Sequence, residues 1–166
     1  MSRLPRITTG SEVAERIRLR RGGSLRPLDE MLLHSEPVAD GWNRLLGAVR
    51  GETTLSDGIR ELVVMRVAAL NGAEYEWQAH SEAAAVAGLS AAQTGALRRA
   101  DAGDGGFDDL QRAVLALTDT MTNEIKVPAE LFSQLSLTFD SRQLLELVAM
   151  VAAYNMVTRL VVALEL

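Results

Sequence analysis

A glutamate and a histidine four residues apart, Glu76 and His80, lie in the segment NGAEYEWQAH at residues 71–80. Residues at this spacing share one face of a helix, so the carboxylate and the imidazole can reach each other. An imidazole held by a carboxylate can act as a general acid or base near neutral pH. The same spacing also occurs in purely structural pairs. It therefore leaves two alternatives, a proton-transfer site and a polar contact inside a helical core.

A second carboxylate is predicted to approach His80 from the preceding helix. Asn71-Gly72 predicts a chain reversal, with Glu61 eleven residues before Gly72 and His80 eight residues after it. The two positions are then offset by about three residues, or ~4.5 Å along the hairpin. Trp77 could form an apolar wall that keeps water from this site, or it could simply fill the core.

Composition excludes several other chemistries. The 166 residues include no cysteine, so thiol catalysis, disulfides and thiolate metal sites are excluded. The net charge of −5 argues against a nucleic-acid surface. We interpret one short basic run as a solvated face; it contains Arg16, Arg18, Arg20 and Arg21. The N-terminal segment carries Glu12 and Glu15 and lacks a continuous apolar stretch, so we expect a cytoplasmic protein.

The elements that position these residues are all predicted to be helices. Apolar residues recur at helical spacing between Ser, Asp, Gly and Pro boundaries, and no stretch alternates with period two. The helices are expected at 12–20, from Pro27, from Pro37 to Gly51, at 57–70, from about 73 to Gly88, at 91–100, at 110–121, from Pro128, and from Asp140 or Ser141 onward; a Gly- and Asp-rich loop is expected at 101–109. The prediction is an all-α protein with one domain over 1–166. Residues 1–52 form an N-terminal helical extension and 55–166 the core.

The final predicted helix is apolar nearly all round. Such a helix must be covered, because solvating its outer face would forgo roughly 25 cal/mol per Å² of apolar burial. Polar residues interrupt it too often for a membrane span, namely Glu146, Asn155, Thr158 and Arg159. We therefore expect a second subunit, and not a membrane, to cover part of it.

Two segments resemble a known family. IRELVVMRVAALNGAEYEWQAHSEAAAVAGLS, Ile59 to Ser90, resembles the signature hairpin of the carboxymuconolactone decarboxylase and alkylhydroperoxidase-D superfamily. LVAMVAAYNMVTRLVVALEL resembles the closing helix of that family, in which Tyr154 and Asn155 would serve packing and hydrogen bonding at the oligomer core. The resemblance implies a hairpin-centred alkylhydroperoxidase-D-like fold, assembled as a trimer or hexamer, without a cofactor or a metal.

The superfamily has two chemical branches, and the resemblance sorts this sequence between them. The peroxidase branch carries C-x-x-C-x-x-x-H, with a glutamate twelve residues before the first cysteine. These positions fall on Ala73, Glu76, His80 and Glu61, so both thiols are missing. We therefore expect no thiol peroxidase activity.

The decarboxylase branch carries E-x-x-x-H, which Glu76 and His80 supply. By resemblance, His80 would give and take the proton, Glu76 would orient it, and Glu61 would complete the catalytic set. The implied function is a lyase-like decarboxylase, or an isomerase, that acts on a small unsaturated or cyclic carboxylic acid. The alternative is a non-catalytic oligomeric scaffold or ligand-binding member of the superfamily.

Four further residues are candidates to bind the substrate. Arg66 or Arg159 could hold a substrate carboxylate or a developing oxyanion, or could form structural ion pairs. Tyr75 and Trp77 flank Glu76 and could line the site. The EYEW stretch differs from the decarboxylase proper and is more similar to cysteine-free relatives.

Overall fold

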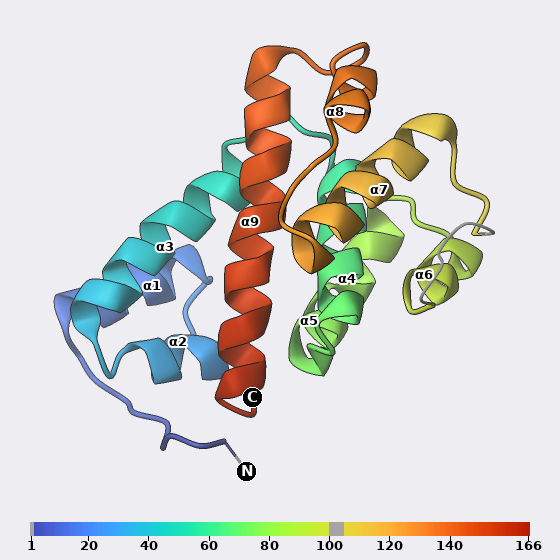
Figure 1. The fold of residues 1–166 in the computed structure, drawn as a ribbon. Helices are drawn as coiled ribbons and strands as arrows, with labels where there is room; N and C mark the ends of the chain where they lie inside the picture. Colours follow the sequence, from blue (N-terminus) through green and yellow to red (C-terminus); the bar gives the residue numbers. More distant parts are fainter. Residues whose placement is uncertain (1, 100–104) are drawn as a thin grey trace. The chain divides into compact units, whose positions relative to one another are not determined.

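The computed structural model describes residues 2–99 and 105–166. Within these residues the chain forms nine α-helices and no strand (Figure 1), as the periodicity predicts. The contacts divide the chain into two compact units, one of residues 1–52 and 163–166 and one of residues 53–162. Residues 101–104 of the predicted loop lie outside the described residues.

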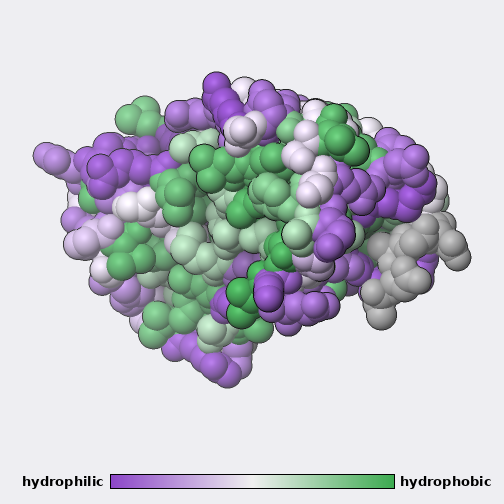
Figure 2. Space-filling model, turned by 45° about the horizontal axis from the view of Figure 1, so that its top comes forward, coloured by the Kyte–Doolittle hydropathy of each residue, from purple (hydrophilic) through white to green (hydrophobic). Residues whose placement is uncertain are grey.

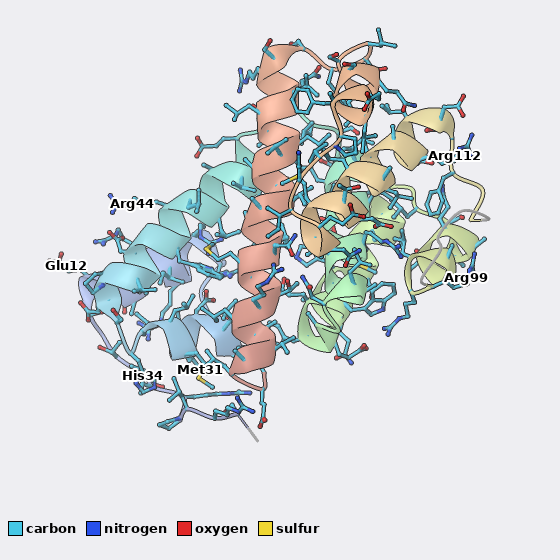
Figure 3. The ribbon with its side chains drawn as sticks, in the orientation of Figure 1. Glu12, Met31, His34, Arg44, Arg99 and Arg112 are labelled. Atoms are coloured by element: carbon cyan, nitrogen blue, oxygen red, sulfur yellow. The ribbon has the colours of Figure 1, made fainter. Side chains whose placement is uncertain are left out.

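The first unit contains α1 (Glu12–Arg20), α2 (Pro27–Leu32) and α3 (Glu36–Gly51). Ser11 caps α1 by accepting a hydrogen bond from the backbone N–H of Ala14. The next two glycines, Gly22 and Gly23, have φ values of 79° and 113°, which L side chains rarely adopt, and they end the helix. The unit also holds His34, the other histidine of the chain, beside Met31 (Figure 3).

The second unit contains α4 (Asp57–Leu70), α5 (Glu74–Val86), α6 (Ala91–Leu97), α7 (Asp109–Asn123), α8 (Ala129–Leu135) and most of α9 (Ser141–Ala163). The predicted capping box of Ser90 and Gln93 is present at the start of α6. The predicted start of α8 is wrong by one residue. Pro128 has an extended ψ of 141° and serves as the N-cap of that helix.

Helices α4 and α5 form the predicted hairpin. Its reversal follows Asn71, where Gly72 adopts a φ of 63°. At the open end of the hairpin, a Cβ on Gly58 would lie 3.3 Å from the carbonyl oxygen of Ala87. Glycine therefore lets the start of α4 approach the end of α5 closely, which fixes the two helices side by side.

Helix α9 is mostly apolar, and three of its polar residues face inward. Tyr154, Asn155 and Thr158 are all buried. By length and composition α9 could cross a membrane. Half of its most apolar 18-residue stretch is buried in the protein, however, and the core helices of soluble proteins can be equally long and apolar. Large apolar side chains of α9 also remain exposed, and apolar residues cover much of the face seen in Figure 2.

Candidate active site

The centre of the site is the contact between His80 on α5 and Glu61 on α4. Nδ1 of His80 lies 2.8 Å from Oε2 of Glu61. An ionised carboxylate can only accept a hydrogen bond, so Nδ1 carries the proton of the neutral imidazole. The other ring nitrogen, Nε2, is then free of a proton and able to accept one.

Two polar groups face Nε2 at longer range. The hydroxyl of Tyr154 on α9 lies 3.4 Å from it, and Oε2 of Glu76 lies 3.7 Å from it. The second distance exceeds that of a hydrogen bond. The Tyr154 hydroxyl can therefore donate a weak hydrogen bond to the unprotonated Nε2, and Glu76 faces the same nitrogen.

Glu76 is the most unusual group of the three. Only 4% of its side chain is exposed, against 14% for His80 and 16% for Glu61. Its Oε2 forms an ion pair with Nε2 of His80 at 3.7 Å when the imidazole is protonated. A nearly buried carboxylate beside an imidazole therefore favours the protonated form of the ring.

The aromatic residues beside Glu76 lie in different surroundings. The Trp77 ring is buried. The guanidinium of Arg98 lies over it in a cation–π contact, 3.9 Å from the ring centroid. Tyr75 is half-buried on the same helix. The imidazole of His80 instead meets the ring of Tyr154 edge to face, with 5.5 Å between the ring centroids.

Arg66 takes part in a different cluster. Its Nε and Nη2 atoms donate to the two carboxylate oxygens of Asp119, each at 2.6 Å. Its Nη1 donates to the carbonyl oxygens of Leu97 and Arg99. None of these contacts involves His80. Arg66 thus joins α4 to α7 and to the end of α6.

Arg159 has an exposed position on α9. Its Nη1 donates to the side-chain and backbone oxygens of Asn155. Asn155 in turn donates to Thr122 and accepts from Asn71, so Arg159 borders a buried amide and hydroxyl network.

The structure brings Glu61, Glu76 and His80 together and adds Tyr154, whose sequence pattern predicted only packing and hydrogen bonding. One signal in the sequence could have indicated that Tyr154 belongs to the site. Three hydrogen-bonding side chains, Tyr154, Asn155 and Thr158, lie close together in an otherwise apolar helix, and buried groups of this kind need hydrogen-bond partners.

The hairpin and its histidine site define an alkylhydroperoxidase-D-like protein. The family model described as "Carboxymuconolactone decarboxylase family" matches residues 19–119. The chain therefore belongs to the carboxymuconolactone decarboxylase family. No curated protein matches the chain.

Three solved structures share the fold. An uncharacterized peroxidase-related protein from Silicibacter sp. TM1040 is 18% identical, with a TM-score of 0.82 over 99% of this chain and 88% of that chain. A protein of unknown function from Agrobacterium tumefaciens, named as a candidate antioxidant defence protein AhpD, is 18% identical, with a TM-score of 0.73 over 81% and 92%. The debrominase Bmp8, solved in complex with 2,3,4-tribromopyrrole, is 16% identical, with a TM-score of 0.75 over 99% and 92%. At these identities the likeness concerns the fold.

Proposed function

We propose that this chain is a cofactor-independent acid–base enzyme, a decarboxylase or an isomerase, that acts on a small unsaturated or cyclic carboxylic acid. One observation carries the proposal. Glu61 binds Nδ1 of His80 at 2.8 Å, and Nε2 faces the Tyr154 hydroxyl and the buried Glu76 carboxylate at 3.4 and 3.7 Å. Family membership and the fold shared with a debrominase support an enzyme of this superfamily.

Each group has a definite role in the proposed reaction. In a decarboxylation, the bond between the carboxyl carbon and its neighbour breaks, and the electron pair stays on the substrate as a carbanion or enolate. Before this step the ring has taken a second proton from solvent on Nε2 and is an imidazolium. Nε2 gives that proton to the carbon, carbon dioxide leaves, and the ring returns to the neutral form with Nδ1 protonated and held by Glu61. In an isomerisation, Nε2 takes a proton from one carbon and returns it to another. The Tyr154 hydroxyl can donate to the developing enolate oxygen.

The candidate substrate-binding arginines differ in whether they already bind a carboxylate of the protein. Two guanidinium nitrogens of Arg66 donate hydrogen bonds to the two carboxylate oxygens of Asp119. Arg159 is exposed and contacts the neutral Asn155, so we propose Arg159 as the group that meets a substrate carboxylate. Tyr75 and Trp77 remain candidates for the walls of the site.

We do not propose peroxide reduction, because the chain has no cysteine that could form a sulfenate or a disulfide. We propose a cytoplasmic homo-oligomer, a trimer or hexamer, that acts on a small molecule and binds neither nucleic acid nor membrane. The exposed apolar residues of α9 support the assembly.

The second candidate is a ligand-binding scaffold that has kept the fold without the chemistry. The observation in its favour is that both ring nitrogens of His80 face protein groups, as in a structural histidine. In that case ligand binding would be insensitive to changes at His80 and Glu76.

A substrate screen in heavy water distinguishes the acid–base enzyme from the ligand-binding scaffold. Small unsaturated and cyclic carboxylic acids are incubated with the protein in D₂O, and NMR records loss of the carboxyl group or incorporation of deuterium. H80Q should reduce turnover by about 10²–10⁴-fold while preserving the thermal midpoint, because the amide can still bond Glu61. H34Q is the matched control and should retain full activity. Equal rates for H80Q and the unsubstituted protein, per folded molecule, would overturn the proposal.

A further inference from the structure

A cavity of about 170 Å³ lies at the closed end of the α4–α5 hairpin. Its lining includes Trp77 and Arg98 but none of the acid–base residues Glu61, Glu76, His80 and Tyr154. Proton transfer at His80 therefore leaves this cavity unexplained.

The floor of the cavity consists of residues with little or no side chain, namely Ala68, Ala69, Gly72 and Ala73. The buried ring of Trp77 also lines it. Small apolar residues beside an aromatic ring leave room for a flat apolar group. A cavity of about 150 Å³ is large enough for a benzene molecule. The cavity is open to solvent on one side, and its accessible surface is more polar than apolar. Its volume thus fits a single planar ring that carries a charged group.

The cavity also holds an arginine that already binds a carboxylate. Both Nη atoms of Arg98 donate to Glu74, at 3.0 and 3.1 Å, while the guanidinium lies over the Trp77 ring. Hydrogen bonding to Arg98 holds the pKa of the Glu74 carboxyl below its usual range, so this carboxylate is charged at neutral pH. The Glu74 side chain occupies the position in which a ligand carboxylate would meet Arg98 in the same bidentate geometry.

We propose that this cavity binds a small planar monocarboxylate. The ligand carboxylate replaces Glu74 on Arg98, and the ligand ring lies on the alanine floor beside Trp77. The exchange is feasible because the side chains of Glu74 and Arg98 are 56% and 49% exposed. Exposed ion pairs contribute little free energy, whereas a ring in the cavity buries apolar area that the Glu74 side chain does not. Arg98 keeps its stacking on Trp77 throughout.

Tryptophan fluorescence tests the site with benzoate as the probe. W42F leaves Trp77 as the only tryptophan of the chain. This substitution suits the purpose because the buried Nε1 of Trp42 has no hydrogen-bond partner among the described residues. We expect benzoate to change the Trp77 emission in a saturable way. Benzamide, which matches benzoate in shape but lacks the charge, should bind more weakly.

Three substitutions at two positions, Glu74 and Arg98, test the predicted direction of each change in binding. E74Q should tighten benzoate binding several-fold, because it removes the competing charge. R98Q should abolish binding, and R98K, which keeps the charge without the fork, should retain weak binding; circular dichroism checks that each variant is folded. Unchanged or weaker binding in E74Q, or full binding in R98Q, would overturn the proposal.

The inference is independent of the proposed function. H80Q should bind benzoate as tightly as the unsubstituted protein does. Loss of binding in H80Q would place benzoate at the acid–base site and overturn the second site. Normal binding in a protein that fails the heavy-water screen would leave the cavity proposal intact.

Discussion

The two ring nitrogens of His80 have different partners, and this difference is the chemical basis of the site. One nitrogen is held at 2.8 Å by Glu61, and the other faces Tyr154 and Glu76 at 3.4 and 3.7 Å. A histidine that serves only packing would gain most from short hydrogen bonds at both nitrogens. The asymmetry leaves Nε2 able to exchange a proton with a bound molecule.

The buried carboxylate of Glu76 predicts a conflict between stability and activity. E76Q replaces a nearly buried charge with a neutral amide of the same shape, so it should stabilise the fold by about 1 kcal/mol at pH 8, where an ordinary imidazole is neutral. The same change should lower turnover. Urea unfolding at pH 8 provides the measurement. E74Q, on the exposed side of the same helix, should leave the unfolding midpoint nearly unchanged. A clear loss of stability in E76Q would show that the charge is a structural requirement.

At the scale of the elements, the buried Arg66 side chain holds α4 to α7 and to the end of α6. It is 1% exposed, and its guanidinium joins α4 to Asp119 on α7 and to two carbonyl groups at the end of α6. R66Q should destabilise the fold by about 3 kcal/mol, because removing one partner leaves Asp119 and the carbonyl groups without a donor. Chemical denaturation measures this loss. R159Q removes an exposed arginine and should change the free energy of unfolding by no more than about 0.5 kcal/mol. Similar changes in the free energy of unfolding for R66Q and R159Q would contradict this structural role of Arg66.

The segment before α4 is tied to α9 by a carboxylate that titrates in acid. Glu146 accepts hydrogen bonds from the hydroxyl and the backbone N–H of Thr54, both at 2.7 Å, and from Arg142. The Thr54 hydroxyl bond, followed by Arg142, holds the pKa of the Glu146 carboxyl below its usual range. The ionised Glu146 therefore contributes its full stabilisation above the pKa of an unfolded glutamate, about 4.3. This stabilisation is lost as the pH falls through the lower pKa that Glu146 has in the folded protein.

Thermal unfolding between pH 6 and pH 3 tests this dependence. The midpoint of E146Q should fall less steeply below about pH 4.3 than that of the unsubstituted protein, because glutamine cannot be protonated there. D109N removes an exposed carboxylate at the start of α7 and should keep the original pH dependence. Parallel curves for E146Q and the unsubstituted protein would remove Glu146 from the acid response.

Local signals explain which elements could be predicted from the sequence. Ser11, Ser56 and Ser90 each precede an apolar periodic segment, and each serves as a helix N-cap in the structure. Pro128 was ambiguous because proline favours both the N-cap region and the first helical turn, and backbone ψ is not encoded in its type. The approach of Glu61 to His80 could be anticipated because one short turn connects the two helices.

At the scale of the whole chain, the exposed apolar residues of α9 predict self-association. Leu145, Met156 and Val162 are 69%, 39% and 46% exposed on a helix whose other face is core. We expect light scattering to give three or six times the mass of one chain. M156E should shift this mass toward that of one chain, because a charge in a buried apolar interface is costly. L19E, a similar change on α1, should leave the assembly intact. A stable monomer of the unsubstituted protein would contradict the proposed interface.

The contacts that could not be predicted join residues far apart in the sequence. Asp119 lies 53 residues from Arg66, and Tyr154 lies 74 residues from His80. Periodicity places each residue on a face of its own helix, but it does not specify which face of another helix lies opposite. Arg66 therefore resembled a ligand for a substrate carboxylate, and Tyr154 resembled a packing residue, until the arrangement of the helices was known.

The protonation of the His80 ring tests the central claim most directly, and it requires no substrate. Nitrogen-15 NMR of the imidazole distinguishes a proton on Nδ1 from one on Nε2, and the chain has only two histidines, so H34Q assigns the signals. The account predicts that neutral His80 carries its proton on Nδ1, that Nε2 gains one on acidification, and that E61Q mixes the two tautomers. A neutral ring with its proton fixed on Nε2 would contradict the account, because Nδ1 would then have no proton to donate to Glu61 and Nε2 could not take one from solvent or from a substrate.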